Sequence, residues 1–97
     1  MKSYKEIEDY LHAKDLYPED ISQPLYKEKF VSTAVYDITI EGDWKHTHRY
    51  LTYLMKELGY VELWEKDITP LSDRGDDWGK SIHRYADKNF VEIFKEK

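Results

Sequence analysis

Hydrophobic and polar residues alternate along residues 30–40 with a period of two, which is typical of a β-strand with one buried face. The period then changes to helical spacing, with a stripe made of Trp44, Thr47, His48, Leu51, Leu54, Met55 and Leu58. Gly59 follows, where a helix can end in a left-handed C-cap. Residues 60–68 return to strand-forming types. This order predicts a β-α-β unit in which two strands pair across a crossover helix.

The N-terminal segment predicts a short amphipathic helix over residues 4–14. Ser3 and Glu6 have the spacing of a capping box. The apolar side chains of this segment fall on one helical face: Tyr4, Ile7, Tyr10 and Leu11. Residues 16–29 predict an ordered connector, and residues 19–22, between two prolines, are compatible with one helical turn.

The C-terminal segment allows two interpretations. Residues 69–77 form the longest polar stretch and predict a loop. Beyond the loop, spacing by four favours a helix through Trp78, Ile82, Ala86, Phe90 and Phe94. The alternative is a strand over residues 80–86 followed by a terminal helix from Asp87. That strand would pair with residues 61–68 as a hairpin and give the order β-α-β-β-α.

Taken together, these segments predict an α+β fold. We expect a small two-layer α/β sandwich with a central β-α-β unit, ferredoxin-like in part, and flanking N- and C-terminal helices. A chain of 97 residues suffices for a single domain, residues 1–97. Within it, residues 1–29 would be the N-terminal helix and connector, and residues 30–97 the core.

Composition narrows the classes of function. The net charge of −5 disfavours general affinity for nucleic-acid backbone, which needs clustered Lys and Arg. The chain has no cysteine, so thiol catalysis and cysteine-ligated metals are excluded. It also has no apolar run of membrane-spanning length. We therefore expect a cytoplasmic protein with no membrane partner.

Asp37 is the first candidate for chemistry, because a carboxylate within a strand is unfavourable unless it is exposed or paired. Asp67 or Glu65 of the second strand could approach it. It would be either a metal-binding or general-base carboxylate, or a polar residue on a solvated or interface face, and the second interpretation is favoured.

The segment around Asp37 resembles a known family. Val35-Tyr36-Asp37-Ile38, followed by a helix through residues 49–60, looks like the opening of Cas2-type ferredoxin-like proteins, whose small relatives include GhoS and VapD. The resemblance covers residues 35–68. It implies a ferredoxin-like sheet and a dimeric, metal-dependent nuclease in which Asp37 binds the metal.

The histidines do not have the spacing of a metal-binding pair. His46 and His48 are two residues apart, so on a helix they point in different directions. His48 lies on the apolar stripe and is interpreted as a buried, hydrogen-bonded residue. His12 and His83 are isolated in the sequence. A metal site built from His48, Asp37 and a loop aspartate is left as an alternative.

An acidic loop and two tyrosines are candidate contact residues. Asp73, Asp76 and Asp77 precede Trp78, and such a mixture of carboxylates and aromatics suits a basic partner. Alternatively, the loop is solvated and Asp77 caps the next helix. Tyr50 and Tyr53 either form a partner or dimer surface or, as slightly favoured, widen the buried stripe.

From these observations we expect an acidic, tyrosine-rich protein-interaction module without catalysis, an inhibitor or accessory factor of phage, immunity or antitoxin type. Its partner would be a protein with a basic surface, and a homodimer is also compatible. No cofactor and no metal site are expected. The predicted binding residues are Asp73, Asp76, Asp77, Trp78, Tyr50 and Tyr53. The alternative is a Cas2-like metal-dependent nuclease or RNA-processing dimer that uses Asp37, the one case in which nucleic acid is a partner.

Overall fold

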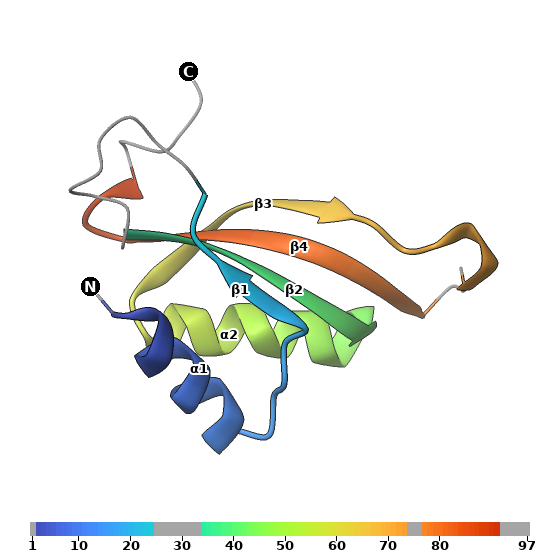
Figure 1. Cartoon of the computed structure of the whole chain (residues 1–97), viewed down its shortest axis with the longest axis horizontal. Helices are drawn as coiled ribbons and strands as arrows, with labels where there is room; N and C mark the ends of the chain where they lie inside the picture. The colour runs from blue at the N-terminus through green and yellow to red at the C-terminus, as the bar shows by residue number, and fades with distance from the viewer. Residues whose placement is uncertain (1, 25–33, 74–76, 92–97) are drawn as a thin grey trace.

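The computed structural model describes residues 2–24, 34–73 and 77–91. It is an α+β fold in which two helices lie on one face of a four-stranded antiparallel sheet (Figure 1). The elements in chain order are α1 (Tyr4–Ala13), β1 (Asp20–Ser22), β2 (Val35–Asp43), a π-helical turn (Trp44–His48), α2 (Arg49–Glu57), β3 (Tyr60–Asp67), a 3-10 turn (Leu71–Asp73) and β4 (Trp78–Asp87). None of the helices in the described ranges combines the length and apolar character needed to cross a bilayer.

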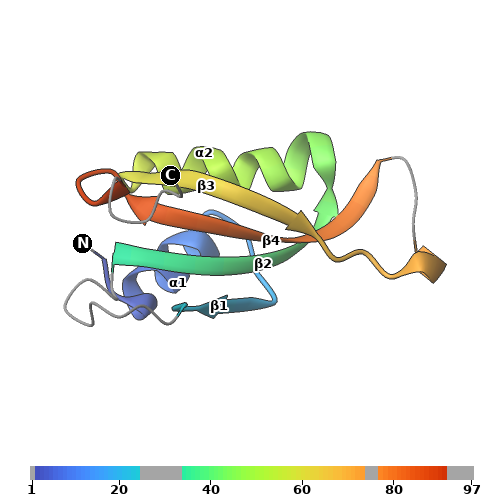
Figure 2. The ribbon, with the colours of Figure 1, turned by 90° about the horizontal axis from the view of Figure 1, so that it is seen from above.

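The strands follow one another across the sheet in the order β1-β2-β4-β3. β4 is antiparallel to both of its neighbours, so β2 and β3 run parallel to each other with β4 between them (Figure 2). The predicted direct pairing of the two strands that flank the crossover helix is therefore wrong. The β-α-β unit exists, but it is split by the last strand of the chain.

The segment from Trp78 is a strand and not the helix that its spacing by four favours. Gly79, Ser81, His83 and Tyr85 are buried, while the residues between them are half-exposed. Pairing with both β2 and β3 gives this segment backbone partners on each side, which outweighs the local helical pattern. The hairpin alternative is thus confirmed. The terminal helix does not begin at Asp87 as expected, because Asp87 is the last residue of β4 and residues 88–90 form a turn, and residues 92–97 lie outside the described part of the chain.

α1 begins and α2 ends where the local sequence predicts, whereas the expected helix from Trp44 is a π-helical turn as far as His48 and an α-helix only from Arg49. Ser3 accepts a hydrogen bond from the amide of Glu6, and Glu6 reaches back to the amide of Ser3. Gly59, after α2, has a φ of 89°, the left-handed conformation that favours glycine. The connector after α1 is described as far as residue 24, and within it Asp20–Ser22 pairs with β2 as a strand, so the helical turn expected there is wrong.

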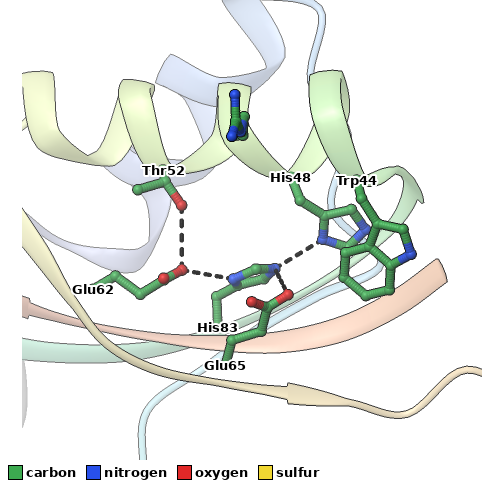
Figure 3. Close-up of a pocket in the computed structure, with 7 residues that line it drawn as sticks. Trp44, His48, Thr52, Glu62, Glu65 and His83 are labelled. Carbon is green, nitrogen blue, oxygen red and sulfur yellow. Dashed lines mark hydrogen bonds and ion pairs between the residues drawn. The ribbon is translucent and has the colours of Figure 1, made fainter. Parts of the chain in front are cut away.

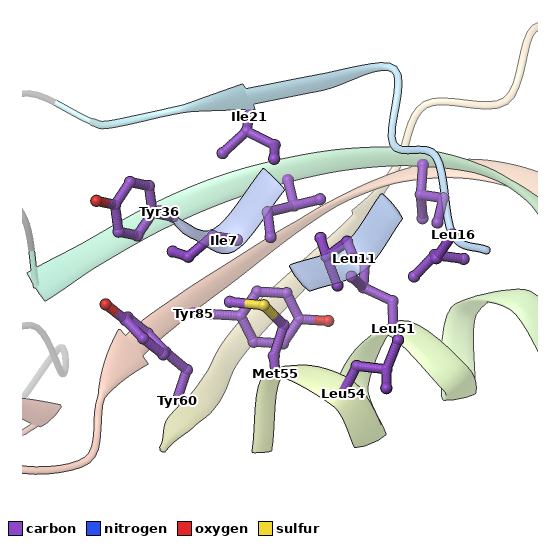
Figure 4. Close-up of a cluster of buried hydrophobic side chains, with 12 residues drawn as sticks. Ile7, Leu11, Leu16, Ile21, Tyr36, Leu51, Leu54, Met55, Tyr60 and Tyr85 are labelled. Atoms are coloured by element: carbon purple, nitrogen blue, oxygen red, sulfur yellow. The ribbon is translucent and has the colours of Figure 1, made fainter. Parts of the chain in front are cut away.

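The core lies between the sheet and both helices (Figure 4). It consists of Ile7, Leu11, Leu16, Ile21, Tyr36, Ile38, Ile40, Leu51, Leu54, Met55, Tyr60 and Tyr85. Tyr4, expected on the buried face of α1, is 44% exposed. Because α1 and β1 contribute side chains to this core, the N-terminal segment is part of the packed structure. On the opposite face of the sheet, Val35 and Ala86 belong to a second, smaller cluster.

Candidate metal centre

A pocket of about 390 Å³ opens between α2 and the β3–β4 hairpin (Figure 3). Two carboxylates and a buried histidine come from the hairpin, and the other lining residues come from the π-helical turn and α2. The lining consists of Trp44, His48, Arg49, Thr52, Glu62, Glu65 and His83. Polar side chains therefore converge at one edge of the hydrophobic core, which is the usual setting of a ligand site.

A β-bulge in β3 places both carboxylates on the pocket side. Glu62 is paired with Tyr85 and Trp64 with Arg84, so Leu63 is an extra residue in the ladder. In a regular strand Glu62 and Glu65, three residues apart, would point to opposite faces of the sheet. The extra residue shifts the alternation, and Glu65 then lies opposite His83 on the face covered by α2.

The π-helical turn before α2 holds His48 in place. Asp43 caps this turn by accepting hydrogen bonds from the amides of Lys45 and His46. The indole of Trp44 stacks on the imidazole of His48, with ring centroids 4.2 Å apart and planes inclined by 25°. His48 is 4% exposed, as its place on the apolar stripe predicts. π-Helical turns recur at functional sites.

Hydrogen bonds fix the outer nitrogen of each histidine. Nε2 of His48 lies 2.9 Å from the carbonyl oxygen of Gly79 and must donate to it, since a carbonyl only accepts. Nδ1 of His83 lies 2.7 Å from Oε1 of Glu62 and donates to that carboxylate. In their neutral forms the two rings therefore present bare lone pairs at Nδ1 of His48 and Nε2 of His83.

These two lone pairs face each other. Nδ1 of His48 and Nε2 of His83 are 2.9 Å apart, in an environment where His83 is only 2% exposed. Two lone pairs at this distance repel unless a cation stands between them. Either one extra proton or a metal ion can bind between Nδ1 of His48 and Nε2 of His83.

Glu65 supplies the third ligand atom. Its Oε1 lies 3.9 Å from Nε2 of His83 and accepts a hydrogen bond from the Ser81 hydroxyl at 3.2 Å. One ligand atom from each of Glu65, His48 and His83 lies within 4.8 Å of the other two. Tetrahedral zinc with ordinary bond lengths separates its ligand atoms by about 3.3 Å, so changes of up to about 1.5 Å in the separations between these atoms would complete the coordination.

Glu62 acts on the site through His83. Its Oε1 also accepts a hydrogen bond from the Thr52 hydroxyl, which contacts the Tyr85 hydroxyl at 2.9 Å. Burial opposes the ionisation of Glu62, but the hydrogen bond and charge of His83 outweigh it and lower the pKa of Glu62. An ionised Glu62 keeps the Nδ1 proton of His83 in place, as carboxylates do behind metal-bound histidines.

Of the residues considered as site residues from the sequence, His48 lines this pocket, but Asp37 does not join it, so the alternative site of His48, Asp37 and a loop aspartate is wrong. Asp37 is on the opposite face of the sheet and pairs with Arg84, not with Asp67 or Glu65 of β3, which is two strands away. Asp77 is exposed, and Trp78 opens β4, so the helix that Asp77 was expected to cap does not exist.

The remaining predicted contact residues that the structure describes do not line the pocket. Asp73 closes the 3-10 turn, and Asp76 lies outside the described residues. Tyr50 and Tyr53 are 39% and 58% exposed, so they do not widen the buried stripe. The hydroxyl of Tyr50 donates to the backbone carbonyl of Lys14.

His83, Glu62 and Glu65 were not predicted from the sequence as members of one site. One signal was available, because alternation along residues 79–85 would have put His83 on the buried face of a strand. The bulge at Leu63 leaves no such signal, so the joint presence of Glu62 and Glu65 at the pocket could not be predicted.

Comparison with protein-family models, with curated protein sequences and with solved structures finds no match for this chain. The proposal of a function therefore rests on the geometry of the pocket alone.

Proposed function

We propose that this protein binds a divalent transition-metal ion through Nδ1 of His48, Nε2 of His83 and a carboxylate oxygen of Glu65. The observation that carries the proposal is the pair of inward-facing nitrogens 2.9 Å apart, whose outer nitrogens are each anchored by an acceptor. Anchoring of this kind orients the ligands of known metal sites.

The donor set favours zinc or a related ion. Imidazole nitrogen suits Zn²⁺, Fe²⁺, Co²⁺ and Ni²⁺, whereas Mg²⁺ and Ca²⁺ prefer oxygen ligands. Two histidines and one glutamate are a ligand set of catalytic zinc sites, in which water or substrate takes the fourth position. Glu65 is 40% exposed in its side chain, so the fourth position would face the open pocket. A metal-bound water there is suited to hydrolysis.

The test is a titration of the purified, metal-free protein with Zn²⁺ by calorimetry and with Co²⁺ by visible absorption. We expect one ion per chain and a tetrahedral or five-coordinate Co²⁺ spectrum. His48→Ala and His83→Ala should abolish binding, and Glu65→Gln should weaken it. His46→Ala is the matched control, because the His46 side chain is 84% exposed and lies outside the pocket.

Two results would overturn the proposal. Binding that is equally strong in wild type, His48→Ala and His83→Ala would place the metal elsewhere. A wild-type protein that binds neither ion would mean that the two histidines share only a proton. Circular dichroism of each variant keeps a folding defect separate from a lost ligand, and Glu65→Gln provides a further variant at a more exposed position.

Binding of a protein partner through Asp73, Asp76, Asp77, Trp78, Tyr50 and Tyr53 stays a second prediction. It is supported by the exposure of Asp77, Tyr50 and Tyr53, none of which lines the pocket. The test is affinity capture with wild type and with an Asp77→Asn/Tyr53→Ala variant. Equal capture by both would count against this role, and neither substitution should alter metal binding.

The Cas2-like nuclease also stays a prediction, supported by the resemblance of residues 35–68. Asp37 already accepts two hydrogen bonds from Arg84, which makes it a less available metal ligand than Glu65. Incubation with RNA and DNA in Mg²⁺ or Mn²⁺ tests this function. Cleavage that is lost in Asp37→Ala and retained in His83→Ala would favour it over the metal centre proposed above.

A further inference from the structure

Arg49 brings a positively charged side chain to the lining of the pocket. It is the first residue of α2, and its side chain is exposed. Within the described residues it forms no ion pair, although Glu62 and Glu65 line the same pocket. Both carboxylates are already engaged, Glu62 by His83 and Thr52 and Glu65 by Ser81. The guanidinium of Arg49 is therefore available to a ligand.

The charges in the pocket make an anion the fitting ligand only when the metal is bound. The carboxylates of Glu62 and Glu65 balance a dication, and Arg49 is then the excess positive charge. Without the metal, Arg49 alone faces the two carboxylates, so no excess positive charge remains for an anion. An anion and the metal ion should therefore bind together, each raising the affinity for the other.

The two recognition elements differ in what they require of the anion. A guanidinium presents parallel N–H donors that match two oxygen atoms of one group. The open coordination position of the metal takes one more oxygen atom. A carboxylate has only two oxygens, whereas a phosphoryl group has at least three exposed oxygens and can satisfy both elements at once.

We propose that the metal-loaded pocket binds the phosphoryl group of a small phosphate compound, with one oxygen on the metal and others on Arg49. This inference rests on the proposed metal centre. The pocket volume of about 390 Å³ lies within the range of small-molecule sites. Trp44, which lines the same pocket, gives the remainder of such a compound an aromatic wall.

The experiment adds inorganic phosphate, phenyl phosphate or acetate to the Co²⁺-loaded protein and follows the visible spectrum of the ion. We expect phosphate and phenyl phosphate to change the spectrum with saturation, and acetate to bind more weakly by roughly tenfold or more. Tighter binding of phenyl phosphate than of inorganic phosphate would identify an esterified ligand. Calorimetry on the metal-free protein should detect no phosphate binding.

Arg49→Gln should weaken phosphate binding by roughly tenfold or more and leave the Co²⁺ affinity unchanged. Lys45→Gln is the matched control, since Lys45 is an exposed cation of the same segment that does not line the pocket. Phosphate binding that survives Arg49→Gln, equals acetate binding or occurs without metal would overturn the inference while the metal centre stands. Failure of the protein to bind Co²⁺ or Zn²⁺ would remove both proposals.

Discussion

The guanidinium of Arg84 donates two hydrogen bonds to the carboxylate of Asp37, at 2.7 Å to Oδ1 and 2.9 Å to Oδ2. The two residues lie opposite each other on β4 and β2, and the guanidinium also packs over the ring of Trp64, 4.6 Å from its centroid. The strand carboxylate that the sequence singles out is therefore paired across the sheet, on the face away from the pocket.

Replacement of Asp37 should lower stability rather than metal affinity. Asp37→Asn removes the carboxylate charge and weakens the interaction with the Arg84 guanidinium. Both side chains are less than a quarter exposed, so water replaces this interaction poorly. We expect the free energy of unfolding to fall by about 1–3 kcal/mol, measured by urea denaturation. Asp9→Asn, which removes an exposed ion pair with Lys5, should lower the free energy of unfolding far less. Equal losses in the two variants would contradict this assignment.

Glu62→Gln should weaken metal binding although Glu62 is not a ligand. The substitution keeps the size of the side chain but removes the charge that holds the Nδ1 proton of His83. Loss of such a partner typically lowers metal affinity by about 10–100-fold, which competition with a chelator can measure. Glu57→Gln, at an exposed position of α2, is the control. A Glu62→Gln protein with wild-type affinity would show that His83 is oriented by other groups.

Gly79→Ala should disturb both the fold and the metal centre. A Cβ atom at this position would lie 2.0 Å from Cζ2 of Trp44 and 2.8 Å from Oγ1 of Thr69. The indole of Trp44, which stacks on the imidazole of His48, must therefore move. We expect a loss of about 1–3 kcal/mol in unfolding free energy and weaker metal binding.

A double-mutant cycle identifies the cause of this loss. If the clash with the indole is responsible, Gly79→Ala should cost less stability in a Trp44→Leu background than in wild type. Equal costs in the two backgrounds would place the strain elsewhere, at Thr69 or in the backbone of β4.

Alkaline pH should unfold the protein as buried tyrosines ionise. Burial raises the pKa of Tyr36 to about 12, with a further contribution from Tyr60, and burial also raises the pKa values of Tyr60 and Tyr85. Because the folded-state pKa exceeds the unfolded value near ~10, this contribution to stability is complete below pH ~10 and is lost as pH rises toward about 12.

Tyrosinate absorbance and circular dichroism, recorded together, test this expectation. Part of the tyrosinate absorbance should appear only in a step that coincides with unfolding. The protein in denaturant is the control, in which all nine tyrosines should titrate in one step. A single step near pH ~10 in the folded protein, with unchanged dichroism, would contradict the burial of these phenols.

The sequence by itself determined the fold class, the start of α1 and the end of α2. The capping box at Ser3, the stripe from Trp44 to Leu58 and the stop at Gly59 are short-range features, because caps and helical faces depend on residues a few positions apart. The burial of His48 follows from its place on that stripe.

Only the tertiary structure decided the sheet order and brought the residues of the proposed metal centre together. Trp78–Asp87 becomes a strand because β2 and β3 offer it backbone partners on both sides, an effect that local spacing does not contain. His83 then reaches His48, 35 residues away, and the bulge at Leu63 turns Glu65 toward them. Contacts of this kind depend on strand register, and register is set by the packing of the whole sheet against α2.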